Sequence, residues 1–200
     1  MERTEFKSHI SAKYNQNLED LFNQVLEMGG LVEVQMSNAL EAVKCENKAL
    51  AKEIKQIDKI VNKEELEIDR ICACVLARQQ PAASDLRLIV SAIRMAVDLE
   101  RIGDEAVNVS KLAIKMAKVS DIPCNTLPGY KQLLDILAIS ANMLKNVLSG
   151  FSQLDVGEFV DVIDDENKVD EIKSEALANI KKSLNDSTAI DAEYKTVSYT

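Results

Sequence analysis

Tryptophan is absent from this chain of 200 residues, and aromatic residues make up only 4% of it. Glycine (6 residues) and proline (3 residues), the main turn formers, are also scarce. These absences argue against a β-rich fold, because strands favour aromatic side chains and need many turns between them. The hydrophobic content of 46% allows a sizeable core, and the overall composition is typical of long helices.

A positive net charge is missing too. The formal net charge is −9 at pH 7, whereas nucleic-acid binding depends mainly on Lys and Arg that neutralise phosphates. No run of about 18 consecutive apolar residues occurs, so nothing predicts a membrane-spanning helix. The first residues lack the character of a signal peptide. We therefore expect a cytoplasmic protein with no nucleic-acid partner and no insertion into a membrane.

Residues that commonly serve catalysis or zinc binding are few. The four cysteines form no CxxC pair, and the single histidine, His9, lies near the N-terminus. A ferritin-like di-iron site, which needs a Glu-x-x-His pattern, is therefore not expected. The sequence also contains no P-loop and no dinucleotide-binding glycine motif. We predict that the protein is not an enzyme.

What is present is a three- and four-residue spacing of apolar side chains, which is the pattern of amphipathic helices. It predicts three helices in the first part of the chain, over about residues 15–43, 48–78 and 82–118. Asn47 is the expected N-cap of the second helix. Pro81 is expected in the first turn of the third helix.

The second part of the chain follows a linker at 120–129 that contains two of the three prolines. A fourth helix is predicted through Phe151, and a capping box at Asp155–Glu158 is expected to open a fifth. A turn at Asn185–Thr188 then predicts a sixth helix, which begins at about Ala189 and is truncated. The fold class is therefore all-α, with two tandem three-helix bundles at 1–122 and 123–200.

An internal repeat relates the two predicted bundles. A shift of 108 residues, the separation of Val61 and Val169, aligns the apolar positions of the two halves. The same shift places Asp58 and Asn62 opposite Glu166 and Asp170. The counterparts of an acidic pair in the third helix would lie just beyond Thr200. We therefore expect the natural chain to be longer and to carry a second acidic motif there.

The acidic pair belongs to a row of oxygen donors on one face of the third helix. Glu100, Asp104 and Asn108 recur at every fourth residue and continue an apolar stripe of the same helix. A similar row in the second helix contains Asp58 and Asn62, followed by Glu65 and Asp69. Such donors suit a hard cation. The alternative is that both rows are simply solvated faces.

The sequence from Leu76 to Val90, LARQQPAASDLRLIV, followed by DLERIGD at 98–104, resembles the PhoU family. The resemblance implies two similar three-helix bundles and metal binding through Glu/Asp-x-x-x-Asp motifs. Glu100–Asp104 matches that motif, Asp58–Asn62 matches the companion element, and Glu166–Asp170 is its counterpart in the second half. The implied metal ligands are Glu100, Asp104, Asn108, Asp58, Asn62, Glu166 and Asp170. Fe, Zn, Mg or Mn would suit them.

The same resemblance implies a regulatory function. Members of the family act as negative regulators of the phosphate-starvation response. They link the cytoplasmic parts of the phosphate ABC transporter to a sensor histidine kinase, at the inner face of the membrane. The apolar stripe of Leu86, Val90, Ile93 and Val97 suggests a homodimer contact, and the alternative is that the stripe is buried against the other bundle of the same chain. The alternative function is a helical interaction scaffold that has no specific metal site.

Overall fold

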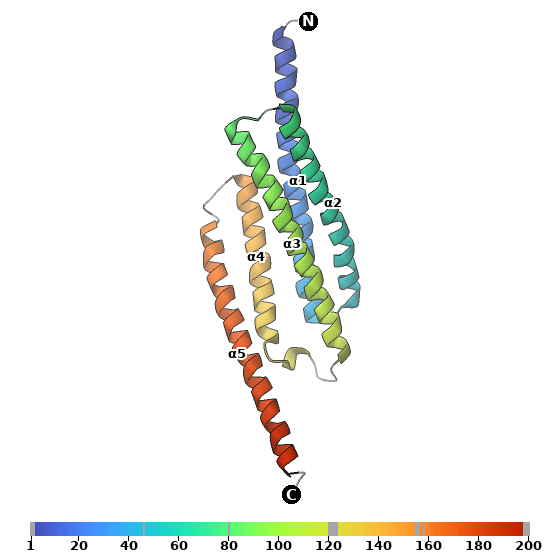
Figure 1. Cartoon of the computed structure of the whole chain (residues 1–200), viewed down its shortest axis with the longest axis vertical. Coiled ribbons are helices and arrows are strands. Elements are labelled where there is room, and N and C mark those ends of the chain that lie inside the picture. The colour runs from blue at the N-terminus through green and yellow to red at the C-terminus, as the bar shows by residue number, and fades with distance from the viewer. Residues whose placement is uncertain are drawn as a thin grey trace. The chain divides into compact units, whose positions relative to one another are not determined.

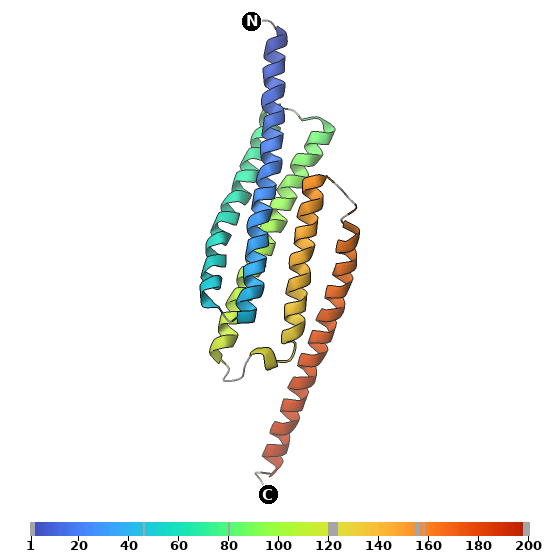
Figure 2. The same cartoon turned by 180° about the vertical axis from the view of Figure 1, so that it is seen from behind.

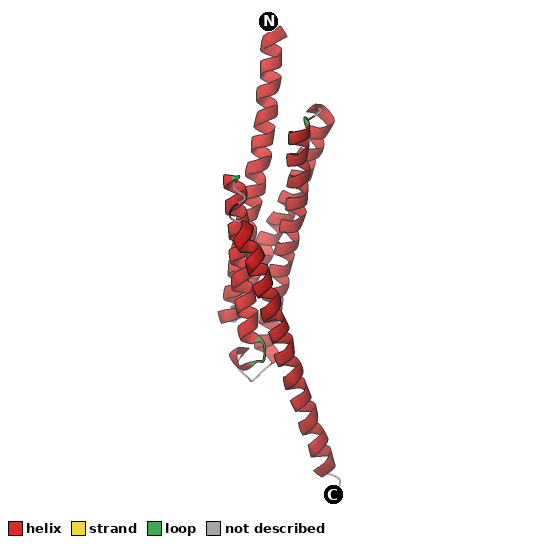
Figure 3. Ribbon diagram, turned by 90° about the vertical axis from the view of Figure 1, so that its left-hand side faces the viewer, coloured by secondary structure: helices red, strands yellow, loops and turns green. Residues whose placement is uncertain are grey.

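A computed structural model of the chain describes the backbone of residues 3–45, 47–79, 81–119, 124–154, 157 and 159–197. These residues form α-helices and one short 3₁₀-helix, and no strand occurs among them (Figure 3). The helices are α1 (Arg3–Cys45), α2 (Lys48–Gln79), α3 (Ala83–Val119), η1 (Cys124–Thr126), α4 (Tyr130–Gln153) and α5 (Phe159–Val197). The predicted all-α class is confirmed.

The chain divides into two compact units. The first comprises Met1–Ala42 and Asn47–Lys111, which includes α2 and most of α1 and α3. The second comprises Val43–Glu46 and Leu112–Thr200, which includes η1, α4 and α5. In the first unit α1, α2 and α3 run alongside one another as a bundle (Figures 1 and 2).

The core of the first unit is built from stripes of small and medium apolar side chains on its three helices. Their spacing of three or four residues places each stripe on one face of its helix, where the neighbouring helices bury it. Each fully buried aliphatic side chain contributes about 1.5–3 kcal/mol relative to its exposed state. Residues buried here include Leu21, Val25, Met28, Val32, Ile54, Val61, Ile68, Cys72, Ile89, Ala92, Ala96, Leu99 and Ala106.

Two local predictions in the first unit have different outcomes. Asn47 is the N-cap of α2 as expected, because its Oδ1 accepts a hydrogen bond of 2.9 Å from the Ala49 backbone N–H. The prediction for Pro81 was wrong by two residues, since α3 begins at Ala83. The Leu86 N–H donates to the Ala82 carbonyl over 2.9 Å, so Ala82 occupies the N-cap position and Pro81 precedes it.

In the second unit α4 and α5 pack side by side in opposite directions (Figures 1 and 2). Leu137, Leu144 and Leu148 form the buried face of α4. Gly129 starts α4 with φ of 83°, and Leu154 ends it with φ of 54°. Apolar side chains such as Ile163 and Leu177 of α5 are exposed.

The predicted turn at Asn185–Thr188 and the separate sixth helix were wrong, because α5 continues unbroken to Val197. The segment contains neither glycine nor proline, and Asn, Asp, Ser and Thr only weakly disfavour a helix. Under the 108-residue shift, the counterpart of Pro81 is Ala189, a strong helix former. The predicted capping box at Asp155–Glu158 lies outside the described residues, except for Gly157.

Within the described helices, no stretch combines the length and the apolar character that crossing a membrane requires.

Candidate metal-binding site

Glu100 lies in a cluster of carboxylates contributed by α2 and α3. Burial raises the pKa of Glu100 above its ordinary value, and the negative charges of Asp104, Glu65 and Asp58 raise it further. Arg101 offsets this effect only in part. The charges of Asp58 and Glu65 on α2 therefore act on Glu100 of α3.

Helix geometry places each carboxylate in the cluster. Glu100 and Asp104 are one turn apart on α3, where Glu100 is half-buried and Asp104 is exposed. Asp58 and Glu65 are both half-buried and lie two turns apart on one face of α2. Like charges that act on one another in this way destabilise the bundle unless a cation or a proton compensates them.

One atom of the cluster lacks a hydrogen-bond partner. Asp58 Oδ1 is buried and accepts no hydrogen bond from any residue that the structure describes. A buried carboxylate oxygen without a donor is costly, and a bound cation is one way to satisfy it. The unpartnered oxygen and the surrounding negative charges are of the chemical type that binds a hard divalent cation.

The side chains do not yet converge on one point. Across the described parts of the chain, no three Asp, Glu, His or Cys side chains are placed so that they could hold one metal ion between them. Closing a shell around a cation would require carboxylates such as Asp104, which is exposed, to turn inward by side-chain rotation.

Two other predicted ligands of the first unit lie at its surface. Asn62 on α2 and Asn108 on α3 are both exposed. The side-chain oxygen of Asn108 accepts a long hydrogen bond of 3.5 Å from Lys111 Nζ, one turn further along the same helix. Nothing in the described contacts draws either amide into the carboxylate cluster.

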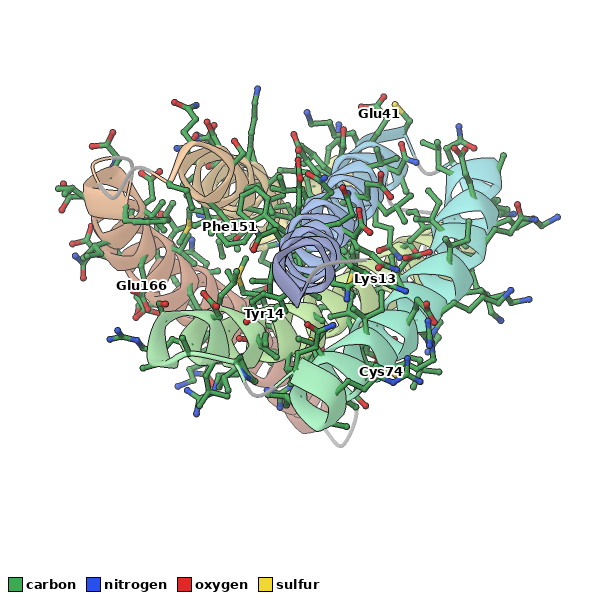
Figure 4. The ribbon with its side chains drawn as sticks, turned by 90° about the horizontal axis from the view of Figure 1, so that it is seen from above. Lys13, Tyr14, Glu41, Cys74, Phe151 and Glu166 are labelled. Atoms are coloured by element: carbon green, nitrogen blue, oxygen red, sulfur yellow. The ribbon has the colours of Figure 1, made fainter. Side chains whose placement is uncertain are left out.

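Glu166, labelled in Figure 4, and Asp170 are both exposed and lie one turn apart on α5 in the second unit. Asp170 forms a loose ion pair of 3.9 Å with Lys173, and the Ser174 hydroxyl donates to the Asp170 carbonyl over 2.9 Å. Asp170 also lines a shallow, open depression together with Asn167, Glu171 and Ser174. All of these residues come from α5, so this face has donors from a single helix.

Glu65 is the residue that the sequence analysis left out of the ligand set. Its charge raises the pKa of Glu100, which places it in the cluster beside Asp58 and Asp104. The sequence contained a signal for it, because Glu65 lies seven residues after Asp58 in the same polar row. Seven residues return almost to the same helix face, whereas four residues lead to the exposed Asn62.

Comparison with known proteins identifies the class of this helical fold. The family model described as "PhoU domain" matches residues 25–113, which contain the carboxylate cluster. The crystal structure of PhoU from Pseudomonas aeruginosa superposes with a TM-score of 0.81 at 36% identity, covering 89% of this chain and 84% of that one. The PhoU regulatory protein from Streptococcus pneumoniae gives a TM-score of 0.69 at 27% identity, covering 80% of this chain and 72% of that one.

Curated relatives of the chain belong to the same family. The PhoU homolog of Pseudomonas aeruginosa, a phosphate-specific transport system accessory protein, is 38% identical over 172 residues, which are 86% of this chain and 69% of the relative. The protein of that name from Escherichia coli K12 is 34% identical over 171 residues, again 86% and 69%. The chain belongs to the PhoU family, and it spans about two thirds of the length of these relatives.

Proposed function

We propose that this protein is an accessory and regulatory protein of phosphate-specific transport, and that it binds a metal ion between α2 and α3. The relatives' shared name as transport accessory proteins supports the first part. The second part depends on one observation above all, the cluster of Asp58, Glu65, Glu100 and Asp104 with the unpartnered Asp58 Oδ1 at its buried side.

The ligand chemistry narrows the choice of ion. Carboxylate oxygens without imidazole or thiolate neighbours favour Mg²⁺ or Mn²⁺, while Fe and Zn also accept them. A cation bound between α2 and α3 would neutralise the like charges and join the two helices. Glu166 and Asp170 stay a prediction as the corresponding element of the second unit, since α5 alone supplies them.

The proposed partners follow from the accessory role. We infer that the protein works on the cytoplasmic side, where it contacts the cytoplasmic parts of a phosphate ABC transporter and a sensor histidine kinase, and that it restrains the phosphate-starvation response. No catalytic step is assigned to it. The partly exposed Leu86, Val90 and Val97 on α3 are the proposed contact of a homodimer.

Co-purification tests this function. The tagged chain, equilibrated with Mn²⁺ or with EDTA, is incubated with the cytoplasmic parts of the transporter and of the kinase. Retention that depends on Mn²⁺ and is lost in Glu100→Gln/Asp104→Asn is the expected result. Equal retention under every condition would favour the alternative, a helical scaffold without a metal-dependent role. Retention of neither partner by the wild-type chain would contradict the regulatory function itself.

A further inference from the structure

Gln35 is an unusual residue in the core of the first unit. It lies in the C-terminal third of α1, and its side chain is 0% exposed. Ser110 is the other fully buried polar side chain in the described part of the chain, and it bonds within its own helix, to the Val107 carbonyl. Gln35 instead reaches to two other helices.

The first contact of Gln35 is with α2. Its Nε2 donates a hydrogen bond of 3.3 Å to the Ile54 carbonyl. In an α-helix a carbonyl accepts the amide proton of the fourth residue after it, so this same oxygen bonds the backbone of Asp58. Gln35 is thereby attached to the turn of α2 that presents Asp58.

The second contact is with α3. The Gln35 Oε1 atom is buried, has no hydrogen-bond donor among the described residues, and lies directly against Gly103. A Cβ atom built on Gly103 would come within 2.7 Å of Oε1, so only glycine leaves room for this approach. Gly103 is the residue between Glu100 and Asp104 that faces the core.

We propose that Gln35 is the positioning residue of the carboxylate cluster. One rigid amide plane contacts α2 at the turn that carries Asp58 and α3 at the turn that carries Glu100 and Asp104, and it thereby sets the register of the two helices. The inference rests on the proposed metal site. Partners outside the ligand shell typically contribute about 10- to 100-fold to metal affinity.

The test compares Gln35→Met, which keeps the volume and removes the amide, with Cys72→Ala as a matched control. Cys72 is also 0% exposed and also reaches a neighbouring helix carbonyl, with its Sγ 3.9 Å from the Ile89 oxygen. It lies farther along α2 than any member of the cluster. Gly103→Ala, which displaces Oε1 from the α3 side, serves as a second variant should Gln35→Met fail to fold.

Calorimetric titration with Mn²⁺, together with thermal unfolding of each chain, separates positioning from packing. We expect about tenfold weaker Mn²⁺ binding in Gln35→Met and Gly103→Ala, and unchanged binding in Cys72→Ala at a comparable loss of Tm. Wild-type affinity in both Gln35→Met and Gly103→Ala would overturn the inference.

If the wild-type chain binds no Mn²⁺, the metal proposal fails and crystal structures of the metal-free chains decide the inference instead. A larger change in the Asp58–Glu100 Cα separation in Gln35→Met than in Cys72→Ala supports positioning. If this separation changes by the same amount in the two variants, the inference is refuted.

Discussion

The Tyr14 hydroxyl donates a hydrogen bond of 2.8 Å to Asp85 Oδ2, joining α1 to the first turn of α3 (Figure 4). Burial of the ring, followed by the hydrogen bond to the Asp85 carboxylate and its charge, raises the pKa of Tyr14 to about 12. Asp85 lies seventy-one residues after Tyr14 in the chain, at the end of the bundle where α3 begins. The bond therefore fixes the start of α3 against α1.

Tyr14→Phe should lower the free energy of unfolding by about 1 kcal/mol, the usual value of one such hydrogen bond. Because the folded pKa lies above the ordinary value of 10.0, the protonated hydroxyl is the form that stabilises the fold. The stabilisation is fully present below pH 10 and is lost as the pH rises toward about 12. Urea unfolding of both chains at several pH values measures this. A difference that stays constant up to the highest pH would contradict it.

Glu100→Gln should stabilise the metal-free chain at pH 7. The folded pKa of Glu100 lies above its ordinary 4.5, since burial, Asp104, Glu65 and Asp58 all disfavour its charge. Stability of the wild-type chain should therefore fall as the pH rises from 4.5 through the raised folded pKa. Removing repulsion of this kind is worth at least a few tenths of a kcal/mol.

Thermal melts in EDTA check the Glu100 prediction. The variant should melt above the wild type at pH 7, and the two should converge near pH 4. Added Mn²⁺ should raise the Tm of the wild type and leave that of the variant unchanged. A variant that melts below the metal-free wild type at pH 7 would show that Glu100 has a stabilising partner.

Gly103 and Gln35 should be energetically coupled. Gly103→Ala forces Oε1 of the buried Gln35 away, because the new Cβ would lie 2.7 Å from it. Overpacking costs about 1–3 kcal/mol, and the better helix propensity of alanine returns about 1 kcal/mol, so we expect a net loss of about 1 kcal/mol. In a Gln35→Ala background the same change should become neutral or stabilising. A double-mutant cycle from denaturant unfolding measures the coupling, and additive effects would exclude the contact.

Replacing two glycines by alanine should change the stability of the protein in opposite directions. Gly30 lies in the middle of α1, and a Cβ added to it would meet no atom within 4 Å, so Gly30→Ala should stabilise by up to about 1 kcal/mol. Gly129 has φ of +83° and Ile180 Cδ1 at 3.1 Å from the position of such a Cβ. Gly129→Ala should destabilise by about 1–2 kcal/mol, the penalty for a left-handed alanine. Differential scanning calorimetry of the two variants compares them, and shifts of the same sign would be inconsistent with this backbone geometry.

The helices of the first unit could be predicted because their apolar spacing, the N-cap at Asn47 and the break near Pro81 all agree. The second unit was harder. Asn185 to Thr188 have the composition of a turn, yet no glycine or proline enforces one and the helix continues. Local composition does not predict this, because the outcome depends on whether the turn or the continued helix has the lower free energy at these residues.

The two rows of polar side chains on α2 and α3 could be predicted from the sequence. Which members of the two rows come together could not. Periodicity places Glu100 and Asp58 on defined faces of their helices, but it does not set the register of one helix against another. That register decides that Glu65 joins the cluster while Asn62 stays exposed. Likewise, Gln35 gave no signal in the sequence, because its role depends on the space left by Gly103, sixty-eight residues later.

The most direct test of the metal site is calorimetric titration with Mn²⁺ of the chelator-treated wild-type chain and of Glu100→Gln/Asp104→Asn. The matched control is Asp98→Asn/Glu105→Gln, which removes two exposed carboxylates from the same helix, outside the cluster. We predict saturable binding by the wild type and the control and its loss in Glu100→Gln/Asp104→Asn. No saturable binding by the wild type, or equal binding by all three chains, would contradict a metal site between α2 and α3.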